Sequence, residues 1–405
     1  MQDHRRLGRE LGLFDSDPLI GAGLPFWLPD GSAARHQVEA YLHDLERRAG
    51  YRHVHSPVLG KRRMFELSGH LANFADDMFP PMAVGEDELM LRPSNCPHHA
   101  MIFRARQRSY RELPLRIAEL APMFRAERSG VLGGLSRVRQ IALNDAHVFC
   151  PEEQAAGEVA RVLRLMREAH AALGLRPASV RLSLRGPGKA YGGSDASWAR
   201  AERLLRDALS SSSFSYAEAE GEAAFYGPKI DVQVADAAGR EWTIATVQID
   251  YHQPERFDLS YIDASGAKAH PVMIHRSLVG SMERLFGHLI ELHDGAFPVW
   301  YAPVQLAVLP VGAAHDEAAA AFAERVLGAG LRAEVLPDGS VGARIRNARR
   351  VPYLAVIGDR EAADGRVALR LRDGRRLDPM PGAEAIALID AVASARSQGL
   401  LPQAR

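Results

Sequence analysis

The sequence predicts an α+β protein: an antiparallel sheet flanked by helices, residues 1–300, followed by a smaller α/β domain, residues 301–405. Three observations support this prediction. The charged segment 123–150 is typical of a strand, a loop and a second strand, and helical apolar patterns separate it from further strands. The segment 297–303 carries two prolines and is typical of a linker, and strands and helices alternate after it.

The elements of the first domain are predicted from the spacing of their apolar residues. A helix over 33–48 has Val38, Tyr41 and Leu42 on one face and leads into an extended segment, 51–59. The further elements, in chain order, are helices over 152–173 and 195–209 and strands around Phe225, Val232 and Val247.

The charged residues of the 123–150 hairpin indicate a binding site. Arg125 and Glu127 are predicted at the end of the first strand and on one face of it, and Asp145 and His147 share a face of the second. Arginines, among them Arg137, flank the loop. A carboxylate and an imidazole beside such a loop favour a site for a phosphate together with a small polar ligand. A solvated basic hairpin is the alternative.

A second candidate site lies in the segment 270–290. Residues 271–275 form a short apolar strand, Gly280 ends it, and Ser281 is expected to cap a following helix. Arg284 falls in the first turn of that helix, where the helix dipole disfavours a cation. An anionic ligand nearby would explain the arginine, and a surface salt bridge is the alternative.

The second domain is predicted to alternate strands and helices as βαβαβ, which favours a parallel-type α/β domain. The elements are strands over 304–310, 333–336 and 353–357 and helices over 317–327 and 341–350. The segment 331–376 holds eleven arginines and six acidic residues. This excess of five positive charges suits an RNA backbone, although a generally arginine-rich composition would also produce it.

Composition limits the function classes. The chain has 405 residues, 47% apolar and 25% charged, and no apolar run of about 18 residues, so we expect a globular protein without a membrane span. Two cysteines do not form a disulfide framework, and the N-terminus lacks the apolar stretch of a signal peptide, so a cytoplasmic location is expected. Because the formal net charge is zero, a nucleic-acid partner requires a local basic patch.

These motifs resemble those of class II aminoacyl-tRNA synthetases. The helix 33–48 with its extended segment resembles motif 1, the Arg-x-Glu hairpin resembles motif 2, and GSMER at 280–284 resembles motif 3. Within the class, the chain is similar to the threonyl-tRNA synthetase family. The matching strings, spread over nearly the whole chain, are NCP (95–97), LPLRIAEL, NDAHVFC, AAFYGPKID, TVQIDY, PVMIHRSLVGSMER and VPY (351–353).

The resemblance implies that the chain activates threonine with ATP and transfers it to tRNA(Thr), with Mg²⁺ accompanying the ATP. It implies that Arg125, as a catalytic residue, contacts the α-phosphate and the amino-acid carboxylate, and that Glu127 orients the adenine amino group. Arg137 and Arg284, the latter also catalytic, would hold the far phosphates and the ring. Arginine suits these tasks because its planar fork binds phosphate through two hydrogen bonds.

The resemblance also implies one zinc ion per chain, held by Cys96, His147 and His275. Their separations alone form no metal motif; the strings around them carry the assignment. Such a set leaves coordination positions open for the amino group and hydroxyl of the substrate.

The amino-acid pocket is also implied by the resemblance. Asp145 would accept the proton of the threonine hydroxyl, Tyr226 and Gln248 would line the pocket, and His70 falls in a family-like string and is taken as substrate-binding. The second domain would be the anticodon-binding domain, and motif 1 implies a homodimer.

Two departures from the family pattern concern the pocket: Leu143 replaces a usual glutamine, and Ser94 replaces a usual methionine. The chain starts at the catalytic domain, so we expect no N-terminal editing domain. Two alternatives stay open. One is a paralogue that adenylates threonine or another β-hydroxy amino acid for a non-tRNA acceptor or a biosynthetic pathway. The other is a non-enzymatic relative, which would not need the motif arginines.

Overall fold

The computed structural model describes residues 3–188, 190–212, 214–236 and 239–402. Contacts divide the chain into two units. The larger unit comprises 16–25 and 41–288, and the smaller unit comprises the residues up to 15, 26–40 and those from 289 onward. The division falls inside two helices, α2 (Pro29–Arg48) and α9 (Met282–His293). The domain boundary at residues 300 and 301 therefore stays a prediction.

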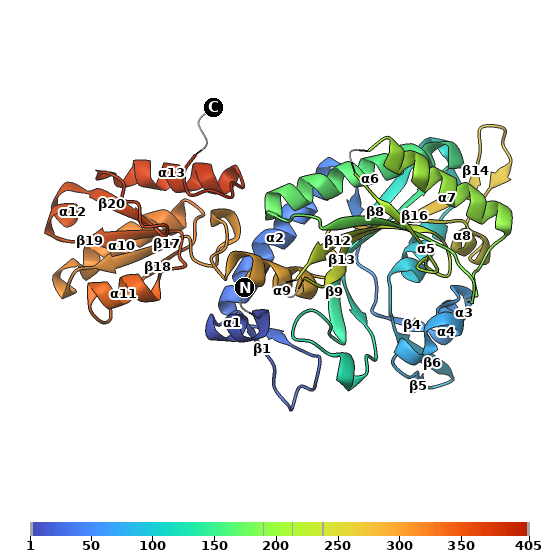
Figure 1. The fold of residues 1–405 in the computed structure, drawn as a ribbon, viewed down its shortest axis with the longest axis horizontal. Helices are drawn as coiled ribbons and strands as arrows, with labels where there is room; N and C mark the ends of the chain where they lie inside the picture. Colours follow the sequence, from blue (N-terminus) through green and yellow to red (C-terminus); the bar gives the residue numbers. More distant parts are fainter. Residues whose placement is uncertain (1–2, 189, 213, 237–238, 403–405) are drawn as a thin grey trace. The chain divides into compact units, whose positions relative to one another are not determined.

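The larger unit is built on an eight-stranded sheet in the order β11-β10-β12-β13-β16-β9-β8-β3 (Figure 1). The strands in that order are Ala217–Glu220, Ser179–Leu184, Lys229–Ala235, Glu241–Asp250, Val272–Ser277, Gln140–Cys150, Leu115–Phe124 and Arg52–His53. The six central strands pair antiparallel, and the two edge pairs, β11 with β10 and β3 with β8, are parallel. The predicted α+β class with a mainly antiparallel sheet is confirmed.

Two long helices, α6 (Glu152–Leu173) and α7 (Asp195–Ser210), lie side by side along one face of this sheet (Figure 1). Their buried residues recur at helical spacing, for example Val159, Val162, Leu163 and Met166 on α6, so each helix has an apolar stripe that covers the strands. A shorter helix, α5 (Cys96–Arg104), packs against β9.

Smaller elements complete the larger unit. The first group is a three-stranded sheet with two short helices: β4 (Leu59–Lys61), β6 (Asp87–Leu91), β5 (Met82–Val84), α3 (Arg62–Leu67) and α4 (His70–Phe74). The second group is β15 (Lys268–Ala269), β14 (Tyr261–Ile262) and β7 (Arg108–Ser109), with the short helix α8 (His252–Arg256) nearby in sequence.

One predicted strand is wrong. Phe225 lies in a turn, where the only regular pairing is an isolated bridge between Ala224 and Gly227. The next residue, Pro228, has no N–H to give to a ladder, and a side chain at Gly227 would meet the carbonyl oxygen of Ile249 at 1.8 Å. The turn therefore packs against β13 instead of extending the sheet.

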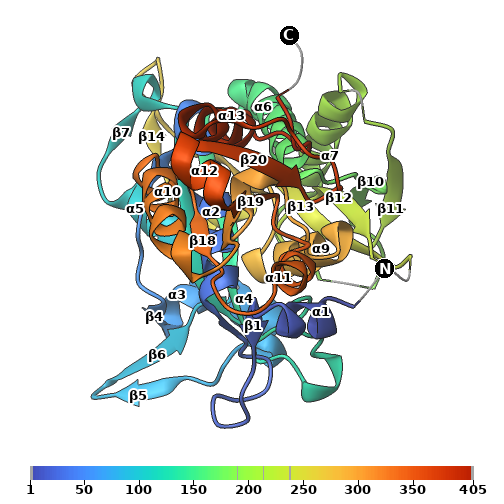
Figure 2. The same cartoon turned by 90° about the vertical axis from the view of Figure 1, so that its left-hand side faces the viewer.

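The C-terminal part of the smaller unit is a five-stranded sheet in the order β18-β17-β19-β20-β21. The strands are Ala333–Val335, Leu306–Pro310, Tyr353–Ile357, Arg366–Leu371 and Met380–Pro381, and the helices are α10 (Asp316–Gly328), α11 (Val341–Asn347), α12 (Asp359–Asp364) and α13 (Gly382–Ser394). Helices α13 and α11 lie on opposite sides of the sheet (Figures 1 and 2). The N-terminal elements of this unit are α1 (His4–Glu10), β1 (Phe14–Asp15) and β2 (Phe26–Trp27).

The central strand β17 is buried on both faces. Leu306 and Val308 pack in one core with α10 and α13, and Ala307 and Leu309 pack in the other with residues around α11. The three strands predicted as parallel pair as predicted, whereas β20 and β21 add an antiparallel edge. Helix α11 ends at Asn347, three residues before the predicted end. Within the described ranges, no helix is both long and apolar enough to cross a membrane.

A buried histidine joins α6 to the segment after β16. The Nε2 atom of His170 lies 2.8 Å from the carbonyl oxygen of Leu278. Burial lowers the pKa of His170 to about 4, with the hydrogen bond opposing the shift. Since an unfolded histidine has a pKa of about 6.5, this group stabilises the fold fully above that pH, and the contribution is lost as the pH falls toward 4.

We therefore expect the free energy of unfolding of the wild-type protein to fall by about 3 kcal/mol between pH 8 and pH 4 because of His170 alone. The variant His170→Gln, which keeps a donor for Leu278, should lack this part of the acid sensitivity. Denaturant unfolding of both proteins at the two pH values measures the difference, and the exposed His55, changed to Gln, is the control. Parallel pH profiles for wild type and His170→Gln would contradict the prediction.

Candidate active site and metal centre

A pocket in the larger unit opens among β9, β13, β16, the first turn of α9 and the loop that follows β8. Nine of the residues predicted for function line it: Cys96, Arg125, Glu127, Arg137, Asp145, Tyr226, Gln248, His275 and Arg284. The other two, His70 and His147, are not among the lining residues and are buried. Leu143 and Ser94 also line the pocket.

The charged hairpin is a strand, loop and strand as predicted, but Arg125 and Glu127 do not lie in a strand. Strand β8 ends at Phe124, so both residues belong to the loop, and the prediction that they share a strand face is wrong. The loop is held because the Arg125 N–H donates to the Arg139 carbonyl at 2.9 Å. Glu127 is buried, accepts a hydrogen bond from Arg137 Nε at 2.9 Å and forms an ion pair with the same guanidinium at 2.7 Å.

Arg284 enters the pocket from the first turn of α9. Ser281 accepts a hydrogen bond from the Arg284 N–H at 3.2 Å, as expected of an N-cap. The guanidinium donates to the carbonyl oxygens of Ser136 at 3.1 Å and Thr243 at 3.4 Å. Burial, together with the charges of Arg125 and Arg137, lowers the pKa of Arg284.

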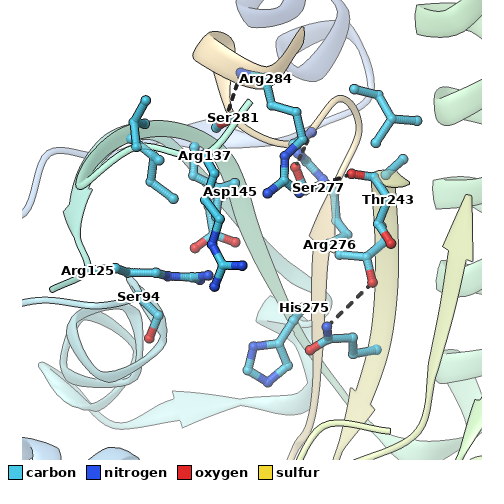
Figure 3. A pocket seen from close by; sticks show the side chains of 18 of the residues that line it. Ser94, Arg125, Arg137, Asp145, Thr243, His275, Arg276, Ser277, Ser281 and Arg284 are labelled. Atoms are coloured by element: carbon cyan, nitrogen blue, oxygen red, sulfur yellow. Dashed lines mark hydrogen bonds between the residues drawn. The ribbon is translucent and has the colours of Figure 1, made fainter. Parts of the chain in front are cut away.

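The cationic side of the pocket is therefore suited to an anion. Figure 3 shows the side chain of Arg125 entering the pocket from the left and that of Arg284 from above, with His275 lower in the view. Like charges gathered in a partly buried place repel one another, and a bound polyanion would relieve that repulsion.

The three predicted metal ligands come together at the pocket, where Cys96 and His275 belong to the lining and His147 is buried beside them. Strand register sets His275 on β16 opposite His147 on β9, and Cys96 is the first residue of α5. One ligand atom from each residue lies within 4.8 Å of the others, and His147 Nε2 is 2.9 Å from His275 Nδ1. A thiol with two imidazoles is a donor set typical of zinc, and three protein ligands leave a position open.

Burial sets the electrostatics of this cluster. It raises the pKa of the Cys96 thiol and lowers the pKa of His147 well below its usual value. Both groups are therefore uncharged in the absence of a cation. A divalent cation among them would supply the charge that stabilises the thiolate, so the residues fit a metal ion.

Three further residues that line the pocket, Tyr226, Gln248 and Asp145, are polar. The Tyr226 ring stacks on His275, with centroids 4.6 Å apart, and its hydroxyl donates to Gln248 Oε1. Asp145 is buried, and burial raises its pKa to about 7 against the opposing charges of Arg276 and Arg92.

Ser94 connects the pocket to His70. Its hydroxyl lies 2.8 Å from His70 Nε2, and His70 Nδ1 lies 2.7 Å from the Ser68 hydroxyl. Burial lowers the pKa of His70 to about 3, so this imidazole is neutral. A methionine at position 94 would lack the hydroxyl that makes this link.

The sequence analysis did not predict two residues that belong to the site. Arg276 lines the pocket, is buried, forms an ion pair with Glu46 at 2.8 Å and lies over the Tyr51 ring at 4.3 Å. Asp250 lies 2.8 Å from His275 Nε2. A charged residue inside the apolar strand 272–277 was the available signal for Arg276, because an arginine in such a strand must find partners.

Two family descriptions match the chain. Residues 82–293 match the class II tRNA synthetase core domain (G, H, P, S and T), and residues 305–391 match an anticodon-binding domain. The larger of these matches covers about half of the chain and contains all the residues that line the pocket.

Individual relatives agree with the family descriptions. The chain is 46% identical over 396 residues to a threonine–tRNA ligase of a Geobacillus strain, which covers 96% of this chain and 62% of that protein. It is 48% identical over 375 residues to threonine–tRNA ligase 1 of Bacillus subtilis, covering 91% and 58%. The chain therefore spans about three fifths of the length of these relatives.

A solved structure is similar over nearly its full length. The RNA-binding domain of threonyl-tRNA synthetase from Cryptosporidium parvum matches with a TM-score of 0.92 and 32% identity, covering 96% of this chain and 98% of that one. With the motif arginines, Cys96 and His275 in one pocket, these comparisons identify the chain as a member of the class II tRNA synthetase family, with threonine–tRNA ligases among its relatives.

Proposed function

We propose that this chain activates threonine with ATP to form threonyl-adenylate and transfers the threonyl group to tRNA(Thr). The observation that carries the proposal is the pocket itself, which brings together two groups of side chains, the arginines on the one hand and Cys96 and His275 of the metal cluster on the other, with Asp145 in the same lining. The first suits a nucleotide polyphosphate, and the second suits an amine and a hydroxyl.

The nucleotide half of the reaction would use the arginines of the loop after β8 and of the first turn of α9. Arg125 contacts the α-phosphate and the amino-acid carboxylate, and Arg137 and Arg284 hold the far phosphates and the ring. Negative charge develops at the α-phosphorus during adenylation, and fixed guanidinium groups stabilise it without rearranging. Glu127 orients the adenine amino group, and Mg²⁺ accompanies the ATP.

The amino-acid half of the reaction would use the metal cluster and the polar side chains near it. Cys96, His147 and His275 hold one zinc ion, which would supply open positions for the substrate amino group and hydroxyl. Asp145 accepts the hydrogen of the threonine hydroxyl. Tyr226 and Gln248 shape the wall of the pocket, and His70 contributes through Ser94.

The experiment that tests the proposal is ATP–pyrophosphate exchange with each of the twenty amino acids, with and without tRNA(Thr). We expect threonine to give the fastest exchange without tRNA, and threonyl-tRNA to form when tRNA(Thr) is added. Exchange without transfer would support the alternative, adenylation for a non-tRNA acceptor. The match of residues 305–391 to an anticodon-binding domain favours the tRNA-dependent reaction.

A homodimer is proposed on the resemblance of the segment 33–59 to motif 1. Light scattering at micromolar concentration should give twice the chain mass of 44.3 kDa. A monomer at that concentration would contradict it. The cytoplasm, where tRNA is charged, is the proposed location.

A further inference from the structure

Behind the metal cluster, buried side chains from three elements form a hydrogen-bonded row. Glu119 lies on β8, His99 on α5 and His147 on β9, and all three are buried. His99 Nε2 lies 3.2 Å from Glu119 Oε2, and His99 Nδ1 lies 2.7 Å from His147 Nδ1. The other ring nitrogen of His147, Nε2, is the one that faces His275.

The carboxylate at the start of the row is held firmly as an acceptor. The Ser56 N–H and hydroxyl donate to Glu119 at 2.9 and 2.7 Å, and Arg92 forms an ion pair with it at 3.5 Å. Burial would raise the pKa of Glu119, but the hydrogen bonds from His99 and Ser56 and the charge of Arg92 lower it to about 2. An ionised carboxylate only accepts hydrogen bonds, so His99 Nε2 carries the hydrogen that faces it.

The position of the hydrogen on His99 determines the position of the hydrogen on His147. A neutral His99 with its hydrogen on Nε2 has a lone pair on Nδ1, and that lone pair can only accept from His147 Nδ1–H. His147 then has its own lone pair on Nε2. The reverse direction would need hydrogens on both ring nitrogens of His99, and the resulting cation would have no exposed surface and would share its carboxylate, Glu119, with Arg92.

A second carboxylate acts in the same way on the other imidazole. Asp250 Oδ2 lies 2.8 Å from His275 Nε2, so His275 carries its hydrogen there and has a lone pair on Nδ1. Two lone pairs, on His147 Nε2 and His275 Nδ1, therefore face each other at 2.9 Å beside Cys96. Such an arrangement calls for a cation between the two nitrogens.

We propose that His99, oriented by Glu119, is a positioning residue that holds His147 in the tautomer able to bind a metal through Nε2. The inference rests on the proposed zinc site and deepens it. Partners of this kind behind a metal ligand typically change metal affinity by about 10–100-fold when they are removed.

The test compares variants of two neighbouring histidines of α5. His99→Ala removes the acceptor for His147 Nδ1–H, and His99→Asn restores a carbonyl oxygen near the position of the lost Nδ1. His98→Ala is the matched control, because His98 is also buried but hydrogen-bonds to the Leu59 carbonyl, at 3.2 Å. Chelator competition measures the zinc dissociation constant of each full-length protein. The visible absorption spectrum of the Co²⁺-substituted protein reports the ligand geometry.

We expect His99→Ala to bind zinc about 10–100-fold more weakly than the wild type and to show a changed Co²⁺ spectrum, His99→Asn to recover part of the affinity, and His98→Ala to match the wild type. Thermal unfolding of the metal-free proteins separates a general loss of packing, which both alanine variants share, from a specific loss of metal. Equal zinc affinity in His99→Ala and the wild type would overturn this inference alone. A wild-type protein without zinc affinity would overturn the zinc proposal and this inference with it.

Discussion

The variant Cys96→Ala should lose its zinc and its threonine-dependent ATP–pyrophosphate exchange together, with kcat/KM for threonine falling by about 10³-fold or more. Cys96 is the only proposed ligand that supplies a thiolate, and without it two neutral imidazoles must hold the cation alone. Because the cation orients the substrate amine and hydroxyl, its loss removes both recognition and alignment, and several kcal/mol of transition-state stabilisation are lost.

The chain contains its own control for this experiment. Cys150 is the last residue of β9, is fully buried and is not among the residues that line the pocket. Cys150→Ala removes a buried sulfur of the same kind and should cost some stability while keeping one zinc per chain and the exchange activity. Metal analysis and exchange rates for the two variants show whether the loss of zinc and activity is specific to Cys96. Full exchange in a Cys96→Ala protein that contains no zinc would show that the cluster is not part of the reaction.

The second large effect concerns selectivity among amino acids of similar size. Valine has nearly the shape of threonine but offers no hydroxyl to the metal position or to Asp145. A site built to bind a hydroxyl rejects an analogue without it by about 10⁴–10⁵-fold, because its buried polar groups would lose their partners. We expect the ratio of kcat/KM for threonine over valine, measured by pyrophosphate exchange, to lie in that range.

Serine should be rejected far less well. It has the same amine and hydroxyl and lacks a single methyl group, which is worth about 1–3 kcal/mol, or roughly 10–200-fold. The same exchange assay should therefore show measurable serine activation. Leu143 lines the pocket and is half-buried, so its contact with the threonine methyl can add no more than that methyl's share. A threonine-to-serine ratio above about 10⁴ would mean that Leu143 and Ser94 create a selectivity that one methyl contact cannot explain.

The variant Asp145→Asn should affect the discrimination of threonine from valine but not that of threonine from serine. The amide keeps the shape of the side chain but no longer offers a carboxylate to the substrate hydroxyl. The threonine-to-valine ratio should fall by about 10²-fold, whereas the threonine-to-serine ratio should change little because both substrates lose the same contact. Unchanged ratios of both kinds would remove Asp145 from the recognition of the hydroxyl.

Much of the fold could be predicted from the sequence because local patterns encode it. The helical spacing of Val159, Val162, Leu163 and Met166 predicted α6 within its observed limits, and the Ser281 cap predicted the start of α9. These features depend on residues within one or two turns of each other. The strand near Phe225 was wrong because a tertiary contact, the packing of Gly227 on Ile249, outweighs the local preference for extended structure.

The residues of the site could also be predicted from the sequence only in part. Chain order and motif strings were enough to single out Arg125, Glu127 and Arg284, and with them the three candidate ligands of the metal. Which atoms face each other was decided only by tertiary structure. His147 and His275 are 128 residues apart, and the register of β9 against β16 sets them opposite each other. The row from Glu119 through His99 depends on α5 packing against two strands, and no local pattern encodes that, because strand register and helix packing are set by the whole core.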